Sequence, residues 1–405
     1  MKITTRALLS TLIGNTLEYY DFLLFVQFTH LLSHLFFPPS QAKLAAFMTL
    51  GIFSVSFIAR PIGAYIFGRL GDTKGRKYSL SITIIWITLP TFFIGCMPTF
   101  SQIGFYAPLG LIICRIIQGI AVGGEYCNAG IFLMESSPPQ KRCFYSSLLT
   151  ASGSLGSLLA LMAAYLCTVT NNPSSWRFAF LLSPLLGFLG YQLRKNTSES
   201  SAFLKFSAQS TNQLSLKDYP SILLAISTAA LIGALIWVPT TYTQFYLQQI
   251  KGQAHATASF YTAFALLSHL ILSPIGGLLS DKWGYKKMMF LGSIICIIFA
   301  CPLYYCLANN QIIVAQLGFI LLSCLFGGNI HAMLVELFPV DKRCTTASLC
   351  FMLGSSIGSI TPFISVFLIK TFGNPIAPSF YMIFLALQWV FWARYLKQQH
   401  PLAKS

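Results

Sequence analysis

Two long apolar segments are joined by the stretch Gly68-Arg69-Leu70-Gly71-Asp72-Thr73-Lys74-Gly75-Arg76-Lys77. A similar stretch joins two later apolar segments: Gly277-Leu278-Leu279-Ser280-Asp281-Lys282-Trp283-Gly284-Tyr285-Lys286-Lys287. Glycine, aspartate and glycine recur in both at the same spacing. We call them the first and the second repeated loop, and together they indicate a duplicated unit.

A second pair of segments supports the duplication. Residues 135–143 and 336–344 carry Glu, Pro, Lys, Arg and Cys at identical spacing. The two matched pairs occur in the same order along the chain. In an apolar chain, this pattern is typical of a transporter that is built from two related halves.

The composition predicts an integral membrane protein. The chain has 405 residues, of which 55% are hydrophobic and only 9% are charged, whereas soluble domains carry roughly 25% charged residues. The apolar runs are about 20 residues long or longer, which is enough to cross a bilayer as helices. They are continuous, whereas the strands of a membrane β-barrel alternate. We therefore expect an all-α, multi-pass protein.

The formal net charge of +16 follows the predicted topology. Lysine and arginine gather in the loops on one side, which indicates that both termini are cytoplasmic. Anionic lipid headgroups account for this charge without nucleic acid as a partner. The 11 cysteines lie mostly inside apolar runs and form no C-x-x-C pair. They are expected to be buried hydrophobic residues rather than disulfides or metal ligands.

Hydropathy and the positions of turn-forming residues predict twelve helices in two sets of six. They lie near residues 10–35, 44–69, 78–97, 104–134, 144–169, 176–194, 219–249, 256–280, 287–308, 311–338, 345–370 and 376–396. The polar segment 195–217 reads as a cytoplasmic linker. The predicted domains are thus an N-terminal bundle (1–194), the linker (195–217) and a C-terminal bundle (218–405).

This organisation resembles the major facilitator superfamily. The first repeated loop is similar to its signature loop, although Thr73 stands where arginine is usual, and Arg115-Ile116-Ile117-Gln118-Gly119 resembles its fourth-helix motif. Gly14-Asn15-Thr16-Leu17-Glu18-Tyr19-Tyr20-Asp21-Phe22 resembles the opening motif of the metabolite:proton symporters, with Tyr19 in place of tryptophan. That family includes proline/betaine, α-ketoglutarate, citrate and shikimate permeases.

The resemblance carries several expectations. It implies two pseudo-symmetric six-helix bundles in the bacterial inner membrane. It implies a monomer that takes a small-molecule substrate and protons, and that contacts membrane lipids. The energy source would be the proton gradient, so no cofactor and no metal are expected.

Few ionisable residues fall inside the predicted spans, and each costs at least ~2.5 kcal/mol at the bilayer centre. They are Glu18, Asp21, Arg60, Arg115, Glu125, His269 and His331. Gly14, Glu18 and Asp21 share one helix face, and Gly119 with Gly123 should let another helix approach closely. Counting residues places Asp21 and Arg60 roughly 16–18 Å deep, near the middle of a roughly 30 Å hydrocarbon core.

These residues suggest roles. We expect Asp21 to carry the proton with Arg115 as its switchable partner, because the related sugar:proton symporters use a helix 1 aspartate and this arginine in that way. Glu18 and Glu125 are further candidates for proton coupling. The alternative is a static buried ion pair that only fixes helix packing.

Arg60 is the main candidate for substrate binding, because a guanidinium can bind a carboxylate through two parallel hydrogen bonds. Its alternative role is to pair with Glu18 or Glu125. His269 precedes Asp281 by twelve residues, as Arg60 precedes Asp72, so it is either the repeat counterpart of Arg60 or a structural histidine. Weaker candidates for substrate binding are Gln118, Tyr242, Gln244, Asn329 and His331.

The repeated loops suggest a cytoplasmic gate. The resemblance implies that Asp72 and Arg76 form gate contacts between the halves, and Asp72 could also cap a helix N-terminus. Further candidates are Glu135 and Arg142, with Asp281, Glu336 and Arg343 as second-half counterparts. The alternative is that these charges only orient the protein in the membrane.

The sequence thus favours a proton-coupled symporter that imports a small organic acid, an amino acid or a betaine-like zwitterion by alternating access. A proton-driven exporter or exchanger is an open alternative, and a non-transporting nutrient sensor is another. An enzyme is not expected, because no nucleophile–base set, metal spacing, phosphate loop or dinucleotide fingerprint occurs.

Overall fold

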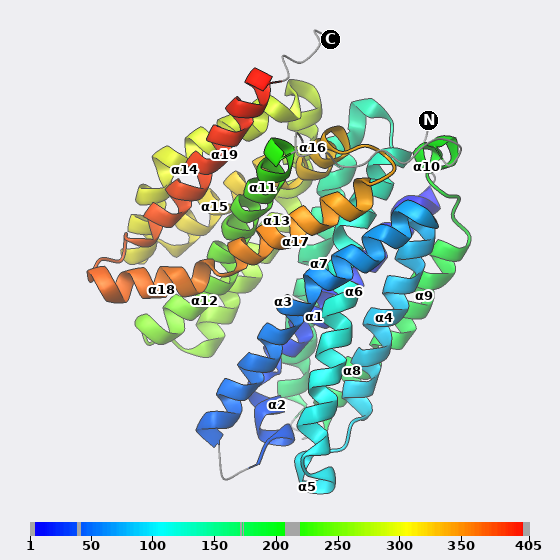
Figure 1. Ribbon diagram of the computed structural model, residues 1–405. Helices are drawn as coiled ribbons and strands as arrows, with labels where there is room; N and C mark the ends of the chain where they lie inside the picture. The colour runs from blue at the N-terminus through cyan, green and yellow to red at the C-terminus, as the bar shows by residue number, and fades with distance from the viewer. Residues whose placement is uncertain (1–4, 39–41, 171, 173, 207–218, 400–405) are drawn as a thin grey trace. The chain divides into compact units, whose positions relative to one another are not determined.

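The computed structural model describes residues 5–38, 42–170, 172, 174–206 and 219–399, and every regular element among them is a helix (Figure 1). The chain divides into two compact units. Unit 1 contains Met1–Ser136 and Ser152–Ser207, and unit 2 contains Ser137–Ala151 and Ala208–Ser405.

Unit 1 is built from the first ten α-helices. They are α1 (Thr5–Gln27), α2 (Thr29–Phe36), α3 (Ala42–Thr73), α4 (Arg76–Cys96), α5 (Phe100–Ile103), α6 (Tyr106–Ser136), α7 (Arg142–Val169) from Ser152 onward, α8 (Ser175–Leu181), α9 (Ser183–Lys195) and α10 (Ser201–Phe206). The predicted linker contains α10, and its residues from 207 onward lie outside the described part of the chain.

Unit 2 holds the remaining helices and the start of α7. They are η2 (Pro139–Lys141), α11 (Tyr219–Trp237), the π-helical η4 (Val238–Tyr242), α12 (Thr243–Phe245), the π-helical η5 (Tyr246–Ile250), α13 (His255–Trp283), α14 (Tyr285–Ala308), α15 (Ile312–Gly327), α16 (Ile330–Leu337), α17 (Arg343–Ser359), α18 (Thr361–Phe372) and α19 (Pro378–Gln399).

All twelve predicted spans are helical in the structure. Eight described segments are long and apolar enough to cross a membrane. The other four predicted spans correspond to α1, α3, α8 with α9, and α19. At two places a span is interrupted shortly before a proline. Pro184 follows the break between α8 and α9, and Pro362 follows the break between α17 and α18, because proline lacks the backbone N–H.

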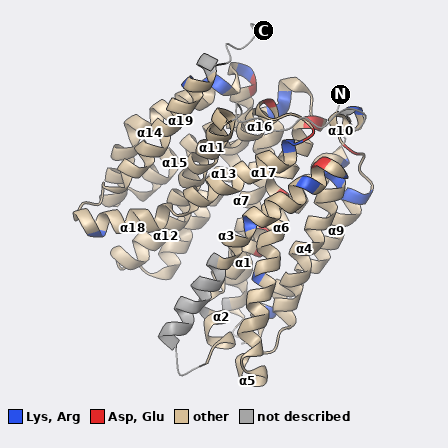
Figure 2. Cartoon of the chain, in the orientation of Figure 1, with Lys and Arg blue, Asp and Glu red and all other residues tan. Residues whose placement is uncertain are grey.

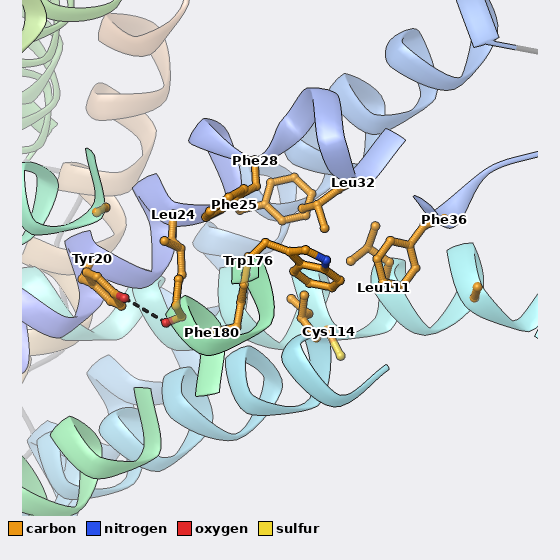
Figure 3. Close-up of a cluster of buried hydrophobic side chains, with 14 of the residues drawn as sticks. Tyr20, Leu24, Phe25, Phe28, Leu32, Phe36, Leu111, Cys114, Trp176 and Phe180 are labelled. Carbon is orange, nitrogen blue, oxygen red and sulfur yellow. Dashed lines mark hydrogen bonds between the residues drawn. The ribbon is translucent and has the colours of Figure 1, made fainter. Parts of the chain in front are cut away.

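An aromatic core joins α1, α2, α6 and α8 in unit 1 (Figure 3). Trp176 packs edge-on against both Phe36 and Phe180, with ring centroids 6.0 and 5.7 Å apart. The Tyr20 hydroxyl donates a 2.8 Å hydrogen bond to the carbonyl oxygen of Ala179. This core fixes the rotation of α1 about its axis, and therefore the direction of the neighbouring carboxylates.

Glycines bring α3 and α6 into backbone contact. A Cβ atom at Gly123 would lie 2.0 Å from the carbonyl oxygen of Arg60, and one at Gly119 would lie 2.3 Å from that of Ser56. The close approach predicted at these two glycines is confirmed. The contact holds the polar residues of α3 beside those of α6.

The same packing recurs in unit 2. A Cβ at Gly276 of α13 would lie 2.4 Å from the carbonyl oxygen of Cys324 on α15. Likewise, Gly156 contacts α1 in unit 1, and Gly354 contacts α11 in unit 2. The helices that pack through glycine occupy equivalent places in the two halves, so the duplication seen in the repeated loops extends to the packing.

The repeated loops also share a backbone conformation. Gly75 directly precedes α4 with φ 107°, and Gly284 directly precedes α14 with φ 90°, a region that favours glycine. Among the described residues, lysine and arginine gather at helix ends, including those that the repeated loops join, and the helix bodies are largely uncharged (Figure 2). The few charged residues inside the helix bodies are therefore exceptions.

We expect Gly123→Ala to lower the stability of the folded protein by about 1–3 kcal/mol, because the added methyl group forces α3 and α6 apart. Gly110→Ala on the same helix is the matched control, since its Cβ would meet only the flexible end of Met97. Thermal unfolding in detergent measures both variants. Equal melting temperatures would contradict the proposed packing.

Candidate functional site

A cavity lies in unit 1, with about 250 Å³ of space that includes its opening to the outside. Its walls come from α1, α3, α4 and α6, and combine charged, polar and apolar side chains. The lining residues are Glu18, Asp21, Phe22, Ser56, Arg60, Ile87, Arg115, Gln118, Gly119 and Val122. Five sequence candidates, namely Glu18, Asp21, Arg60, Arg115 and Gln118, therefore meet at one place.

Asp21 is held by two hydroxyl groups. Thr91 of α4 and Ser183 of α9 each donate a 2.9 Å hydrogen bond to its Oδ2 atom. Its Oδ1 atom has no hydrogen-bond partner among the described residues. No feature of the sequence had singled out Thr91 or Ser183, because their relation to Asp21 depends on how three helices pack.

A polar relay joins Arg115 to Asp21. The guanidinium of Arg115 donates to Gln118 Oε1 at 3.0 Å, and Gln118 Nε2 donates to Thr91 Oγ1 at 2.7 Å. Thr91 in turn donates to Asp21. Asp21 and Arg115 are not among the salt bridges found in the described residues. An amide and a hydroxyl thus connect the two charges by hydrogen bonds.

Aromatic rings support both arginines of the cavity. The Arg115 Cζ atom lies 4.1 Å from the Phe25 ring centroid, and that of Arg60 lies 4.1 Å from Phe57. Phe22 contributes to both, at 5.8 Å from Arg115 and 4.7 Å from Arg60. Stacking occupies the faces of a guanidinium and leaves its edge N–H groups directed elsewhere.

Glu125 pairs with an arginine at the end of the predicted span 176–194, which the sequence analysis did not single out. Arg194 is buried, with 3% exposure, and forms a salt bridge with Glu125. The hydroxyl of Thr83 also donates to Glu125, and Arg194 also donates to the carbonyl oxygen of Leu80. Arg194 is therefore a buried charge, and it takes the partner that had been considered for Arg60.

This pair explains the glycine of the opening motif. A Cβ at Gly14 would lie 1.8 Å from Arg194 Nη2 and 2.9 Å from Glu125 Oε1. Gly14 thus makes room for the Glu125–Arg194 pair, while Glu18 and Asp21, farther along the same helix, line the cavity.

The second-half candidates lie in unit 2 and are mostly buried. Tyr242 ends η4 and packs against Tyr246 and Tyr304, with ring centroids 5.7 and 5.8 Å apart. Asn329 directly precedes α16 and donates to the carbonyl oxygen of Leu325 at 2.6 Å, which ties it to the end of α15.

The two histidines are also buried. The Nδ1 atom of His331 lies 2.8 Å from Ser146 Oγ, and His269 lies in α13 at the position that corresponds to Arg60 in α3. Gln244 is half-buried in α12. Their role in substrate binding stays a prediction.

Each repeated loop is joined to the glutamate that follows it in the same unit. In unit 1, Arg76 donates to both carboxylate oxygens of Glu135, at 3.1 and 3.2 Å, and lies 3.8 Å from Asp72. In unit 2, Tyr285 and Lys286 both contact Glu336. The first pair is buried and the second is about half exposed.

Helix capping is observed at Asp281. Its two oxygens accept 2.9 Å hydrogen bonds from the backbone N–H groups of Cys143 and Phe144, in the first turn of α7. A carboxylate is favoured there because the N-terminus of a helix carries partial positive charge. The capping role suggested for Asp72 is thus performed by its counterpart. Arg343 donates to the carbonyl oxygen of Phe338 at 3.0 Å, and Arg142 begins α7.

Residues 197–206 form a strap that covers the first repeated loop. The Glu199 carboxylate accepts hydrogen bonds from the backbone N–H of Lys77, at 3.1 and 3.3 Å, at the start of α4. Ser200 donates to Glu135 at 2.6 Å. Burial raises the pKa of Glu199 above its usual 4.5, although the hydrogen bonds from backbone N–H groups oppose this shift.

Family models match both halves of the chain. The model described as sugar (and other) transporter matches residues 7–215, and that of the major facilitator superfamily matches residues 222–405. The chain belongs to the major facilitator superfamily. It is therefore a membrane transporter and not an enzyme, and the twelve helices form the two six-helix bundles of that fold.

Curated bacterial relatives cover nearly the whole chain. An inner membrane metabolite transport protein of Escherichia coli (strain K12) is 30% identical over 393 residues, which are 91% of this chain and 88% of that protein. The proline/betaine transporter of the same strain is 28% identical over 405 residues, 94% of this chain and 81% of that protein. These relatives support a multi-pass protein of the inner membrane.

Solved structures confirm the fold. The proton:xylose symporter bound to 6-bromo-6-deoxy-D-glucose matches with a TM-score of 0.79 and 16% identity, over 97% of this chain and 95% of that one. The human organic anion transporter MFSD10 matches with a TM-score of 0.74 and 12% identity, over 96% and 99% of the two chains.

We expect Arg194→Gln to destabilise the protein by about 3–5 kcal/mol, because it leaves the buried carboxylate of Glu125 without its counter-charge. The double variant Glu125→Gln/Arg194→Gln should lose less. Breaking the half-exposed Lys286–Glu336 pair with Lys286→Gln is the control and should cost at most about 1 kcal/mol. Thermal unfolding compares the three, and a double variant that is the least stable would contradict this account.

Glu199 should make stability depend on pH. Because its pKa is raised in the folded state, the folded protein binds this proton more tightly than the unfolded chain. Stability should therefore decrease as the pH rises from about 4.5 through the folded pKa. Glu199→Gln should reduce that slope, as measured by melting temperature across this range. Identical pH profiles of the two proteins would refute the assignment.

Proposed function

We propose that the protein is a proton-coupled symporter that imports a small organic acid, an amino acid or a betaine-like zwitterion by alternating access. The observation that carries this proposal is the cavity of unit 1, where two carboxylates and two guanidinium groups face one space of about 250 Å³. Ionisable groups inside membrane spans are expensive, and they commonly mark substrate and proton pathways.

Asp21 is the proposed proton carrier. One of its oxygens is fixed by two hydroxyl groups, and the other has no partner among the described residues, so it is available to a proton. Arg115 acts on it through Gln118 and Thr91. Since Thr91 both accepts from Gln118 and donates to Asp21, a shift of Arg115 would change the hydrogen bonds that stabilise the charged carboxylate. Glu18 and Glu125 would tune the charge around this relay.

Arg60 is the proposed anchor for a substrate carboxylate. Its guanidinium is stacked on two rings, and such a fixed, planar group can present its edge to a carboxylate in two parallel hydrogen bonds. The names of the curated relatives, which include proline/betaine transporters and a glycine betaine/proline/ectoine/pipecolic acid transporter, support a substrate that carries a carboxylate.

The loop contacts suggest how the cytoplasmic side opens and closes. With both termini cytoplasmic, the repeated loops would lie on that side. The Arg76–Glu135 pair and the Lys286–Glu336 pair would then hold each loop on its own unit. Because exposed pairs contribute only about 0–1 kcal/mol, the second pair is weak enough to break during a transport cycle.

A proton-driven exporter or exchanger would use the same groups with the opposite direction of net flux, and a nutrient sensor would bind substrate without moving it. The symporter, the exporter or exchanger, and the sensor can be distinguished by uptake into proteoliposomes. A panel of labelled metabolites is tested with a proton gradient of either direction. Accumulation on the side toward which protons flow supports the symporter.

We expect Asp21→Asn to abolish proton-driven accumulation while substrate counterflow continues at a rate within about tenfold of the wild type, because a neutral side chain cannot release a proton. Lys251→Gln, which removes an exposed charge in unit 2, is the control and should retain both activities. Unchanged accumulation by Asp21→Asn would exclude Asp21 as the carrier.

A further inference from the structure

Two charged side chains that line the cavity of unit 1 form no salt bridge with another described residue. Glu125 pairs with Arg194, and Glu135 with Arg76. By contrast, the salt bridges of the described residues include neither Glu18 nor Arg60. The Oε2 atom of Glu18 and the Nε atom of Arg60 are both buried and have no hydrogen-bond partner among those residues.

These two groups face the same cavity. Glu18 projects from α1 and Arg60 from α3, and both line its wall together with Phe22. The backbone of Arg60 is fixed by its contact with Gly123, and its guanidinium lies over the Phe22 and Phe57 rings. Arg60 therefore stays a fixed cation that is close to Glu18 without forming a salt bridge with it.

A buried polar atom without a hydrogen bond costs free energy, so such atoms are normally satisfied by the protein or by a ligand. We propose that Glu18 and Arg60 bind the two ends of one zwitterionic substrate, with the substrate carboxylate on Arg60 and its cationic nitrogen on Glu18. This inference rests on the proposed transport function and narrows its substrate class to small amino acids and betaines.

Other substrate classes fit the cavity less well. A dicarboxylate would place its second negative charge beside Glu18 and Asp21, where like charges repel. A neutral sugar would bring no charge to either Glu18 or Arg60. When ionised, Glu18 and Asp21 balance Arg60 and Arg115, so a ligand without net charge keeps the site neutral.

Three probes of similar shape test this assignment. Glycine betaine carries both charges, 3,3-dimethylbutyrate replaces its nitrogen by carbon and keeps only the carboxylate, and choline keeps only the cation. Proline is the second zwitterion, and succinate represents the dicarboxylates. Binding of each to the purified full-length protein is measured by competition and by thermal shift, without any proton gradient.

The wild type should prefer at least one zwitterion over both single-charge probes by about tenfold or more, since each charge-assisted contact contributes at least one such factor. Glu18→Gln should remove the preference for the zwitterion over 3,3-dimethylbutyrate. Arg60→Gln should weaken the binding of both the zwitterion and 3,3-dimethylbutyrate, and it should leave the binding of choline unchanged. Lys370→Gln, an exposed charge in unit 2, is the control and should keep the wild-type ratios.

The readout is the ratio between ligands, so a general loss of folded protein changes none of the outcomes. Glu18→Asp and Arg60→Lys, which retain the charges, should preserve part of the preference. The proposal is overturned if neither zwitterion binds, if succinate or 3,3-dimethylbutyrate binds as tightly as the zwitterions, or if Glu18→Gln keeps the wild-type ratio.

This test is independent of coupling. Zwitterion binding with the expected ratios, but no accumulation in a proton gradient, would refute the symporter and retain the assignment of Glu18 and Arg60. Proton-driven accumulation of another substrate class would support the symporter and refute the assignment of Glu18 and Arg60.

Discussion

The cost of a charge inside an apolar layer governs the structure of this transporter. Each ionised group that enters a membrane span loses its hydration, and the protein must replace it with a counter-charge, hydrogen bonds or a ligand. In unit 1 the buried charges meet this requirement in different ways. Glu125 has Arg194, and Asp21 has two hydroxyl groups. Glu18 and Arg60 face a cavity, where the proposed ligand would meet the same requirement.

Backbone contact between helices makes the cavity possible. The glycines of α6 let α3 approach so closely that the carbonyl oxygens of Ser56 and Arg60 lie against them. As a result, Arg60 and Ser56 of α3 line the same cavity as Arg115 and Gln118 of α6. The aromatic core around Trp176 fixes α1 from another side (Figure 3). Rigid packing therefore positions the polar groups, whereas the polar groups alone could not hold the helices in place.

The two halves have kept their packing and diverged in their chemistry. Glycine contacts and positive-φ glycines recur at equivalent places in both units. The charged groups differ, however. In the second repeat, His269 stands at the position of Arg60, and Tyr285 stands at the position of Arg76. Backbone contacts tolerate no added atom, so they constrain both copies equally. Side chains that face a cavity are under no such steric limit and can specialise.

The sequence by itself determined the helical membrane fold, its duplication and the midplane candidates, because hydropathy, loop motifs and charges inside apolar runs are local signals. It could not assign partners. Arg194 reads as one more basic residue at the end of a span, and Thr91 and Ser183 read as ordinary hydroxyl residues, yet all three hold buried carboxylates. Tertiary structure decided which charges are paired and which face the cavity, because pairing depends on distances between helices that are far apart in the chain.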